Sequence, residues 1–304
     1  MRHSEPNWLF MGILSTLCFA FYGFFGKLSE FQHPLVTNLI IYATASICGI
    51  PLIIANRRRF RFSKSGFLSG VTSNIGAMIM LYTLISNQVL VVFSFVSFAS
   101  VIFFLAILTI DKPRLSPNQK LIATVGVLVA AFGLFLASTS TAGGIRHVLN
   151  NPIVSWQFLL LAPIMPLSFG CWAYFSFVAI KKNNENVSNI CLNYSLASLT
   201  VASTAYLLFR QTFSMSDLFA IRNLYPILAG MFVLIGVGFT LKSYEFTSGQ
   251  SRIEETMVAI LANAEIIPLI FLSYFILKEI TIEGFAGALT VFIGLSILNS
   301  ARTK

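Results

Sequence analysis

The chain carries ten long apolar segments, and this pattern restricts what it can fold into more than any other feature. An apolar segment of about 20 residues crosses a bilayer core as a helix, and a helix satisfies its own backbone hydrogen bonds inside lipid. Only 10% of the 304 residues are charged, against roughly 25% in a soluble domain, so lipid must be the main solvent. The sequence therefore predicts an all-α integral membrane protein. Its ten expected transmembrane helices lie at residues 8–28, 35–55, 66–86, 88–110, 120–138, 156–180, 190–209, 224–242, 256–277 and 285–299.

The basic residues behind the net charge of +9 are unevenly distributed between the segments. If both termini are cytoplasmic, most Lys and Arg residues lie on the inner side, which is the bias that orients membrane helices. We therefore expect a cell-membrane protein with both termini in the cytoplasm. The basic stretch 56–64 is interpreted as an orientation signal that can also contact anionic lipid headgroups, and not as a nucleic-acid surface. The inner set is Arg2, Arg57, Arg58, Arg59, Arg61, Lys64, Lys112, Arg114, Lys120, Lys181, Lys182, Lys242, Arg252, Arg302 and Lys304, and the outer set is Lys27, Arg146, Arg210, Arg222 and Lys278.

The sequence shows no pattern typical of catalysis or metal binding. Its four cysteines fall within apolar segments without a CxxC pair, and its three histidines have no second histidine or carboxylate at ligand spacing. No nucleophile–base pair, zinc motif or phosphate-binding loop is present. We therefore expect no enzyme activity, no metal and no cofactor. A membrane enzyme or a lipid-handling protein remains as the less favoured alternative.

Internal similarity divides the chain into two halves. Each half holds five expected helices, and because five is odd, the second half would enter the membrane from the opposite side. We therefore expect two inverted five-helix repeats, at residues 1–145 and 146–304. Secondary transporters use this architecture, with the substrate site near the midplane between the repeats. The matching stretches, in chain order, are IIYATAS (40–46) with LNYSLAS (192–198), GVTSNIGAMIML (70–81) with GMFVLIGVGFTL (230–241), and GVLVAAFGL (126–134) with GALTVFIGL (287–295).

Motifs of the second half resemble a known family. Residues 171–182 read CWAYFSFVAIKK, residues 243–248 read SYEFTS, and residues 262–281 read ANAEIIPLIFLSYFILKEIT, with Glu265 fourteen residues before Glu279. On these motifs the chain, over about residues 8–300, resembles EamA-type members of the drug/metabolite transporter superfamily. The resemblance implies a solute cavity between helices one to four and six to nine. It also implies transport of a small metabolite, an amino acid or a drug-like molecule.

Glu265 is the carboxylate within AILANAEIIPLIF (259–271), a run with no other charged residue. If its helix begins near residue 252, Glu265 lies about 15 Å along it, close to the midplane, where a charge costs roughly 2.5–3.5 kcal/mol. Pro268 lacks an amide proton and clashes with the carbonyl of Ala264, so we expect that carbonyl to be unpaired in a polar notch halfway through the helix. We predict that Glu265 binds the solute or carries a coupling proton. The alternative is a protonated carboxyl that bonds a neighbouring helix.

Other side chains within the expected spans complete the candidate substrate site. Aromatic residues with a polar group are candidates, although anchoring at the membrane interface is an equal alternative for each. For the two asparagines in the third and seventh spans, the alternative is a helix–helix hydrogen bond. Phenylalanine, with thirty residues, is too abundant to indicate a site. The candidates besides Glu265 are Asn263, Tyr22, Tyr42, Asn74, Trp172, Asn193 and Tyr194.

Prolines and a capping motif predict local geometry. Pro163 and Pro166 fall in the sixth segment and can bend that helix, either as a hinge or as a static kink, and Pro268 has the same potential in the ninth. Residues Ser251 and Glu254 stand at the two ends of SRIE, a capping box that would begin the ninth helix. Glycines seven residues apart in the fifth and tenth segments predict close packing of these helices.

Together these features favour a secondary transporter that works by alternating access. Its expected partners are a small-molecule solute, membrane lipid and, in one version, a proton as the coupling ion. The protein would act as a monomer or homodimer. A channel or passive facilitator is the principal alternative.

Overall fold

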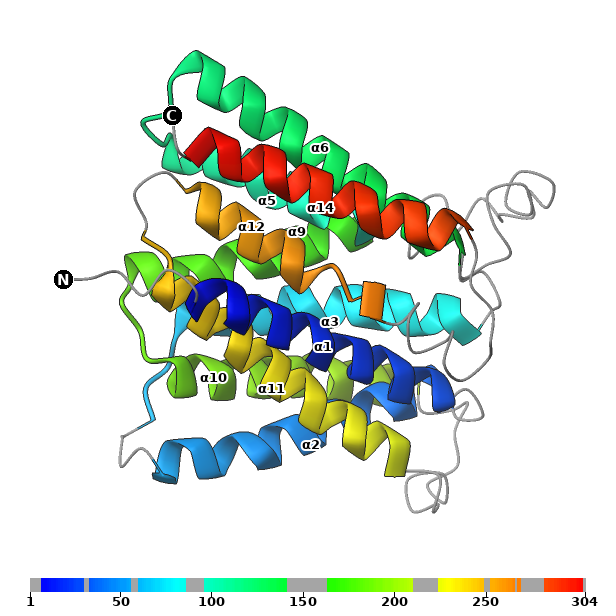
Figure 1. The fold of residues 1–304 in the computed structure, drawn as a ribbon. Helices are drawn as coiled ribbons and strands as arrows, with labels where there is room; N and C mark the ends of the chain where they lie inside the picture. The colour runs from blue at the N-terminus through cyan, green and yellow to red at the C-terminus, as the bar shows by residue number, and fades with distance from the viewer. Residues whose placement is uncertain are drawn as a thin grey trace.

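The computed structural model describes residues 7–29, 33–55, 60–85, 96–140, 163–209, 224–248, 252–265, 267–268 and 282–302. Within these ranges all regular secondary structure is helical. The helices run in roughly one direction across the molecule and form a bundle (Figure 1).

Each expected apolar segment contains a described helix. Seven helices of the described part are long and apolar enough to cross a membrane, so the prediction of a helical membrane protein is confirmed at this level. The helices are α1 (Asn7–Leu28), α2 (Pro34–Ala55), α3 (Lys64–Ile85), α5 (Ala99–Ala106), α6 (Pro117–Ser140), α9 (Ile164–Phe177), α10 (Val187–Leu208), α11 (Leu224–Phe246), α12 (Ile253–Ala262) and α14 (Ile282–Arg302), with one π-helical turn, η1 (Ile107–Asp111), after α5 and another, η2 (Val178–Lys182), after α9.

Helices α6 and α14 pack along each other at one flank of the bundle (Figure 1). Glycine makes this contact possible, because a side-chain carbon on Gly133 would lie 2.6 Å from the amide nitrogen of Val291 and 2.8 Å from the carbonyl of Gly287. The predicted packing role of these glycines is confirmed, and the pair stands beside the other helices as a support.

The remaining helices pair across the two halves of the chain. Helix α1 packs on α11, α3 packs on α9, and α2 packs on α10 and α11. A side-chain carbon at Gly70 of α3 would overlap the carbonyl of Tyr194 on α10, and one at Gly230 of α11 would overlap the carbonyl of Ile41 on α2. The matched glycines of the two halves therefore each bring a helix into backbone contact with a helix of the other half.

Hydroxyl groups fasten α1 to α11. Ser15 Oγ donates to the carbonyl of Gly236 at 3.0 Å and lies 2.6 Å from Thr240 Oγ1. Ser243 Oγ donates to the carbonyl of Trp8 at 2.5 Å. All of these side chains are buried, so the pairing satisfies polar groups that would otherwise face an apolar surrounding.

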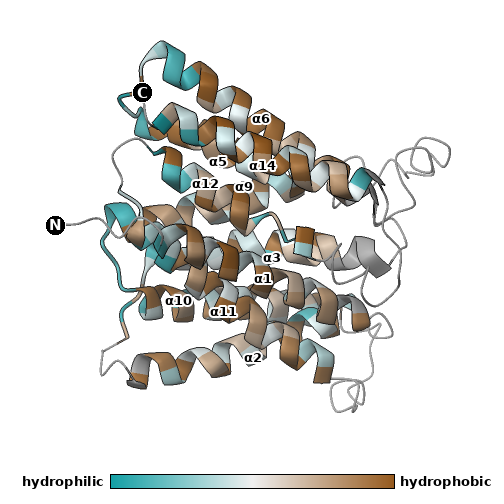
Figure 2. Ribbon diagram, in the orientation of Figure 1, coloured by the Kyte–Doolittle hydropathy of each residue, from teal (hydrophilic) through white to brown (hydrophobic). Residues whose placement is uncertain are grey.

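Hydrophilic residues gather at the end of the bundle where the described chain begins and ends (Figure 2). Here the carboxylate of Asp111, at the end of η1, pairs with Lys182 at the end of η2. Glu254, near the start of α12, pairs with Arg302 at 2.8 Å. Arg252 lies 3.4 Å from Glu255 and its guanidinium covers the ring of Phe177 at 5.0 Å. We call this set, Asp111, Lys181, Lys182, Arg252, Glu254, Glu255 and Arg302, the charged end.

Candidate functional site

Helix α12 ends in the middle of the bundle. Asn263 terminates it, with its amide bonded to the carbonyl of Ile260 and its side-chain Nδ2 donating to the carbonyl of Ala259 at 2.7 Å. The amide of Ala264 bonds the carbonyl of Leu261 at 3.1 Å, which tightens the last turn. Helical backbone returns only at residues 267–268. The chain therefore breaks its helix three residues before Pro268, which can occupy the start of a helix without losing a bond.

This break corrects the expected geometry of the ninth segment in two respects. The carbonyl of Ala264 is not unpaired, because it accepts from the amide of Ile267 at 3.0 Å. The expected capping box is not seen among the described residues: Ser251 lies outside them, Arg252 stands at the N-cap with a φ of 61°, and Glu254 accepts from the amide of Ser248 and pairs with Arg302. A continuous helix with a notch was the wrong picture; the backbone itself is interrupted.

A cavity of about 400 Å³ lies beside the break, between helices from both halves of the chain. Helix positions place it midway along the bundle, since Asn263 lies about 15 Å along α12 at 1.5 Å per residue. Six of the predicted site residues line it and are brought together by the fold: Glu265, Asn263, Tyr22, Tyr42, Trp172 and Tyr194. The other lining residues are Phe19, Ser73, Ala77, Met80, Val96, Phe169, Val233 and Ala262.

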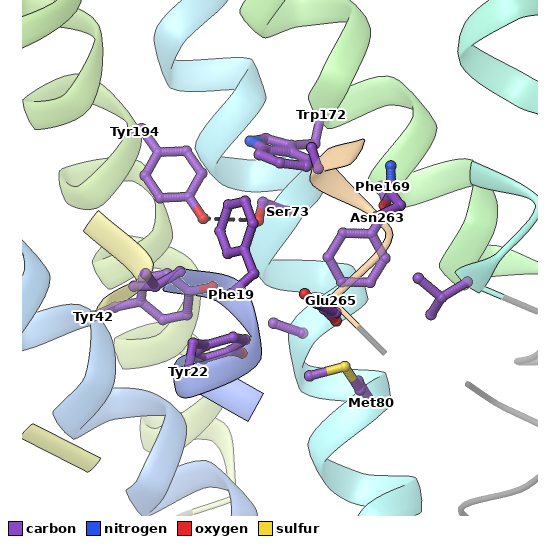
Figure 3. A pocket seen from close by; sticks show the side chains of 14 residues that line it. Phe19, Tyr22, Tyr42, Ser73, Met80, Phe169, Trp172, Tyr194, Asn263 and Glu265 are labelled. Carbon is purple, nitrogen blue, oxygen red and sulfur yellow. Dashed lines mark hydrogen bonds between the residues drawn. The ribbon is translucent and has the colours of Figure 1, made fainter. Parts of the chain in front are cut away.

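The carboxylate of Glu265 faces this cavity, between Phe169 and Met80 in the close view (Figure 3). Among the described residues it makes no hydrogen bond and no ion pair, and no basic side chain lines the cavity with it. The alternative in which the carboxyl bonds a neighbouring helix is therefore without a partner in the described part of the chain. Glu265 is available to a ligand or a proton.

Tyrosine hydroxyls form one wall. The hydroxyl of Tyr194 lies 2.8 Å from Ser73 Oγ (Figure 3). Its ring lies 6.4 Å from that of Tyr42, and both side chains are about 1% exposed. Tyr42 and Tyr194 occupy equivalent places in the matching stretches IIYATAS and LNYSLAS, so each half supplies one tyrosine to the same wall.

Aromatic rings form the facing wall. Phe19 meets Trp172 edge to face, with centroids 5.6 Å apart and an interplanar angle of 86°. The indole N–H of Trp172 is buried and has no acceptor among the described residues. Such an unpaired buried donor costs free energy unless a ligand or water accepts from it, which makes it a candidate contact for a bound molecule.

Sequence reasoning missed Phe19, Ser73 and Phe169. The two phenylalanines were set aside with all others, although each lies three residues, close to one helical turn, before a residue that was selected: Phe19 before Tyr22 and Phe169 before Trp172. That spacing was the available signal. Ser73 carried none, because a single serine in a span is ordinary.

Two candidates lie elsewhere. Asn74 accepts from Nδ2 of Asn38 at 3.3 Å. Asn193 accepts from the amide of Ser63 at 3.1 Å and donates to the carbonyl of Arg61 at 2.9 Å, which fastens the start of α3 to α10. Neither lines the cavity. Their alternative explanation, bonds within the fold, is the one that matches their surroundings.

The proline hinge is placed differently from the expectation. Pro163 is the N-cap residue of α9 and Pro166 lies in its first turn, where a missing amide proton interrupts no hydrogen bond. The stretch before residue 163 lies outside the described residues, and with it any bend there. The break at Asn263–Glu265 is the interruption closest to the cavity.

The charged end closes the bundle on one side of the cavity. Asp111 and Glu255 are buried, with side chains 4% and 0% exposed, and each has a basic neighbour in Arg252. Lys181 donates to the carbonyl of Thr247 at 2.7 Å, and Thr247 in turn donates to Glu255 at 3.0 Å. These contacts join the ends of η1, η2 and α11 to the start of α12.

Comparisons with known proteins concern the fold alone. No family model matches the chain, and no curated protein matches it. A solved structure described only as the crystal structure of a protein is similar, with a TM-score of 0.72. The match covers 99% of this chain and 99% of that chain at 13% sequence identity. The two chains share a fold.

Proposed function

We propose that the protein is a secondary transporter of the EamA type that moves a small metabolite, an amino acid or a drug-like solute by alternating access. The observation that carries this proposal is the unpaired carboxylate of Glu265, which faces a cavity midway along the bundle at a break in its own helix. Discontinuous helices that offer polar groups at the midplane are the usual construction of a transporter site. A carboxylate placed there without a function would only destabilise the fold.

Two inverted five-helix repeats are part of the proposal. Its support is the pairing of α1 with α11 and of α3 with α9, two contacts that exchange the halves of the chain. Further support comes from Tyr42 and Tyr194, which are matched in sequence and adjacent in the cavity wall. A solute between such halves would be exposed to one side or the other as the halves rock.

The proposed orientation puts the charged end in the cytoplasm. The described basic residues gather there, which fits the bias that orients membrane helices. They are Arg61, Lys64, Lys112, Arg114, Lys120, Lys181, Lys182, Lys242, Arg252 and Arg302.

Replacement of Glu265 by Gln tests the proposal. A ligand is first found by screening amino acids, amines, nucleosides and vitamins for a rise in melting temperature of the purified protein. Its flux is then measured in proteoliposomes with an imposed pH gradient. Glu265→Gln keeps the shape of the side chain but cannot release a proton, so we expect pH-driven accumulation to disappear while exchange at saturating solute persists.

The matched control is Glu245→Gln, because Glu245 is an exposed carboxylate outside the cavity whose partner is Lys242. This variant should accumulate solute like the parent. If Glu265→Gln retains accumulation and its pH profile, the role assigned to Glu265 is wrong. If the parent protein equilibrates the solute but never accumulates it against a gradient, the protein is a channel or passive facilitator, and product formation from the solute would instead indicate a membrane enzyme.

A further inference from the structure

We infer that the cavity selects a small organic ammonium ion, a substrate class that rests on the proposed function for its transport but not for its binding. The inference starts from the charge of the wall. Glu265 is the one ionisable acid or base among the lining residues apart from the tyrosine hydroxyls, and the described lining holds no Lys, Arg or His. A ligand with a single positive charge gives this carboxylate the partner that the described residues do not supply.

The rings around the carboxylate favour the same ligand. Phe19, Phe169 and Trp172 line the cavity on the side opposite the tyrosine wall, and Tyr22, Tyr42 and Tyr194 complete a set of six rings. The face of an aromatic ring carries partial negative charge and attracts a cation within about 6 Å of its centroid, most strongly when water is excluded. Aromatic rings together with one carboxylate form a site in which a methylated or primary ammonium group loses its water at the least cost.

Anions and zwitterions fit poorly. A carboxylate on the ligand would meet ring faces and the Glu265 carboxylate, and no guanidinium or ammonium group is present in the described lining to balance it. The remaining donors are neutral: the indole N–H of Trp172, which has no acceptor among the described residues, and the hydroxyls of the tyrosine wall. These suit a hydroxyl, ether or carbonyl oxygen on the ligand.

Four probes of nearly equal size and different charge test the inference. They are choline (cation), 3,3-dimethylbutan-1-ol (its neutral carbon analogue), betaine (zwitterion) and 3,3-dimethylbutanoate (anion). Binding to the purified protein in detergent is measured by calorimetry and by the shift in melting temperature. We expect choline to bind about tenfold or more tightly than its neutral analogue, which corresponds to the loss of one cation–π or charge contact, and the two carboxylates to bind more weakly still.

Variants assign the preference to the cavity. Glu265→Gln should bring the ratio of choline to neutral affinity close to one, while Glu265→Asp, which keeps the charge, should retain most of it. Glu245→Gln should leave the ratio unchanged. Phe19→Leu should weaken choline binding, whereas Phe21→Leu should not, because Phe21 stacks on Phe232 and does not line the cavity.

The outcomes separate this inference from the proposed function. If choline binds no better than the neutral alcohol, or if betaine or the anion binds best, the inference is overturned even when some other solute is accumulated by proteoliposomes. If choline binds with the expected dependence on Glu265 but no ammonium compound crosses the membrane, the inference stands and the transporter proposal fails.

Discussion

At the scale of single residues, the Ser73–Tyr194 hydrogen bond shows how the cavity wall is held. Ser73 lies on α3 and Tyr194 on α10, so the bond at 2.8 Å joins the two halves of the chain. The Tyr194 side chain is about 1% exposed, and a buried hydroxyl without a partner costs free energy. The serine therefore serves both the shape of the wall and the stability of the fold.

Replacement of Ser73 by Ala should destabilise the protein by about 1–2 kcal/mol, because the Tyr194 hydroxyl would lose its partner while remaining buried. Unfolding in detergent by a chemical denaturant gives the measurement. The double variant Ser73→Ala/Tyr194→Phe removes both members and should recover part of the loss. A single and a double variant of equal stability would show that the bond contributes nothing.

The site residues that could be predicted are those whose chemistry is unusual inside an apolar span. Glu265, Trp172 and the tyrosines were found for this reason. The same reasoning also selected Asn74 and Asn193, since an amide in a span needs a partner whether it lines a cavity or fastens two helices. Their partners, Asn38 for Asn74 and the backbone at residues 61–63 for Asn193, come from other parts of the chain, and no local pattern reveals them.

At the scale of elements, the existence of each helix follows from the apolar segments, but the interruption of α12 does not. Pro268 explains why the helix is weakened, yet a kink and a break have the same local sequence. What stabilises the break is Thr16 of α1, whose hydroxyl donates to the carbonyl of Leu261 at 2.6 Å and satisfies one of the last carbonyls of α12. That contact depends on how α1 and α12 pack.

The start of α12 gives a second prediction at this scale. Glu254 is 3% exposed and holds both Arg302 of α14 and the amide of Ser248. Glu254→Gln should destabilise the protein by about 2–3 kcal/mol, because it removes one member of a largely buried ion pair, an effect reduced by the partial exposure of Arg302. Glu245→Gln breaks an exposed pair with Lys242 and should cost less than about 1 kcal/mol.

Both variants are compared by denaturant unfolding in the same detergent at low and at high salt. The cost of Glu245→Gln should shrink as salt rises, since salt screens exposed charges, and that of Glu254→Gln should persist. Equal costs for the two variants would contradict the structural contribution assigned to the charged end.

At the scale of the whole molecule, the bundle has one charged end, and the proposed orientation turns it towards the cytoplasm. Cysteines introduced as Arg2→Cys and Thr303→Cys, in a background without the native cysteines, should be protected from an impermeant thiol reagent in intact cells. His147→Cys should be labelled. The expectation rests on the excess of Lys and Arg at one end, and labelling of position 2 or 303 in sealed cells would reverse the orientation.

The hydroxyl bonds between α1 and its distant partners have a consequence for biogenesis. Ser15 bonds the carbonyl of Gly236, Trp8 offers its carbonyl to Ser243, and Thr16 reaches Leu261, so the partners are separated by 221, 235 and 245 residues. A ribosome adds about 5–20 residues per second, and α1 therefore waits roughly 10–50 s in the membrane before α11 and α12 exist. During that interval its hydroxyls can bond only to its own backbone, as Thr16 does with the carbonyl of Gly12 at 2.9 Å. The first helix to be made is thus among the last to reach its final place, and a nascent chain stalled before residue 236 should hold α1 exposed to crosslinking by the insertion machinery.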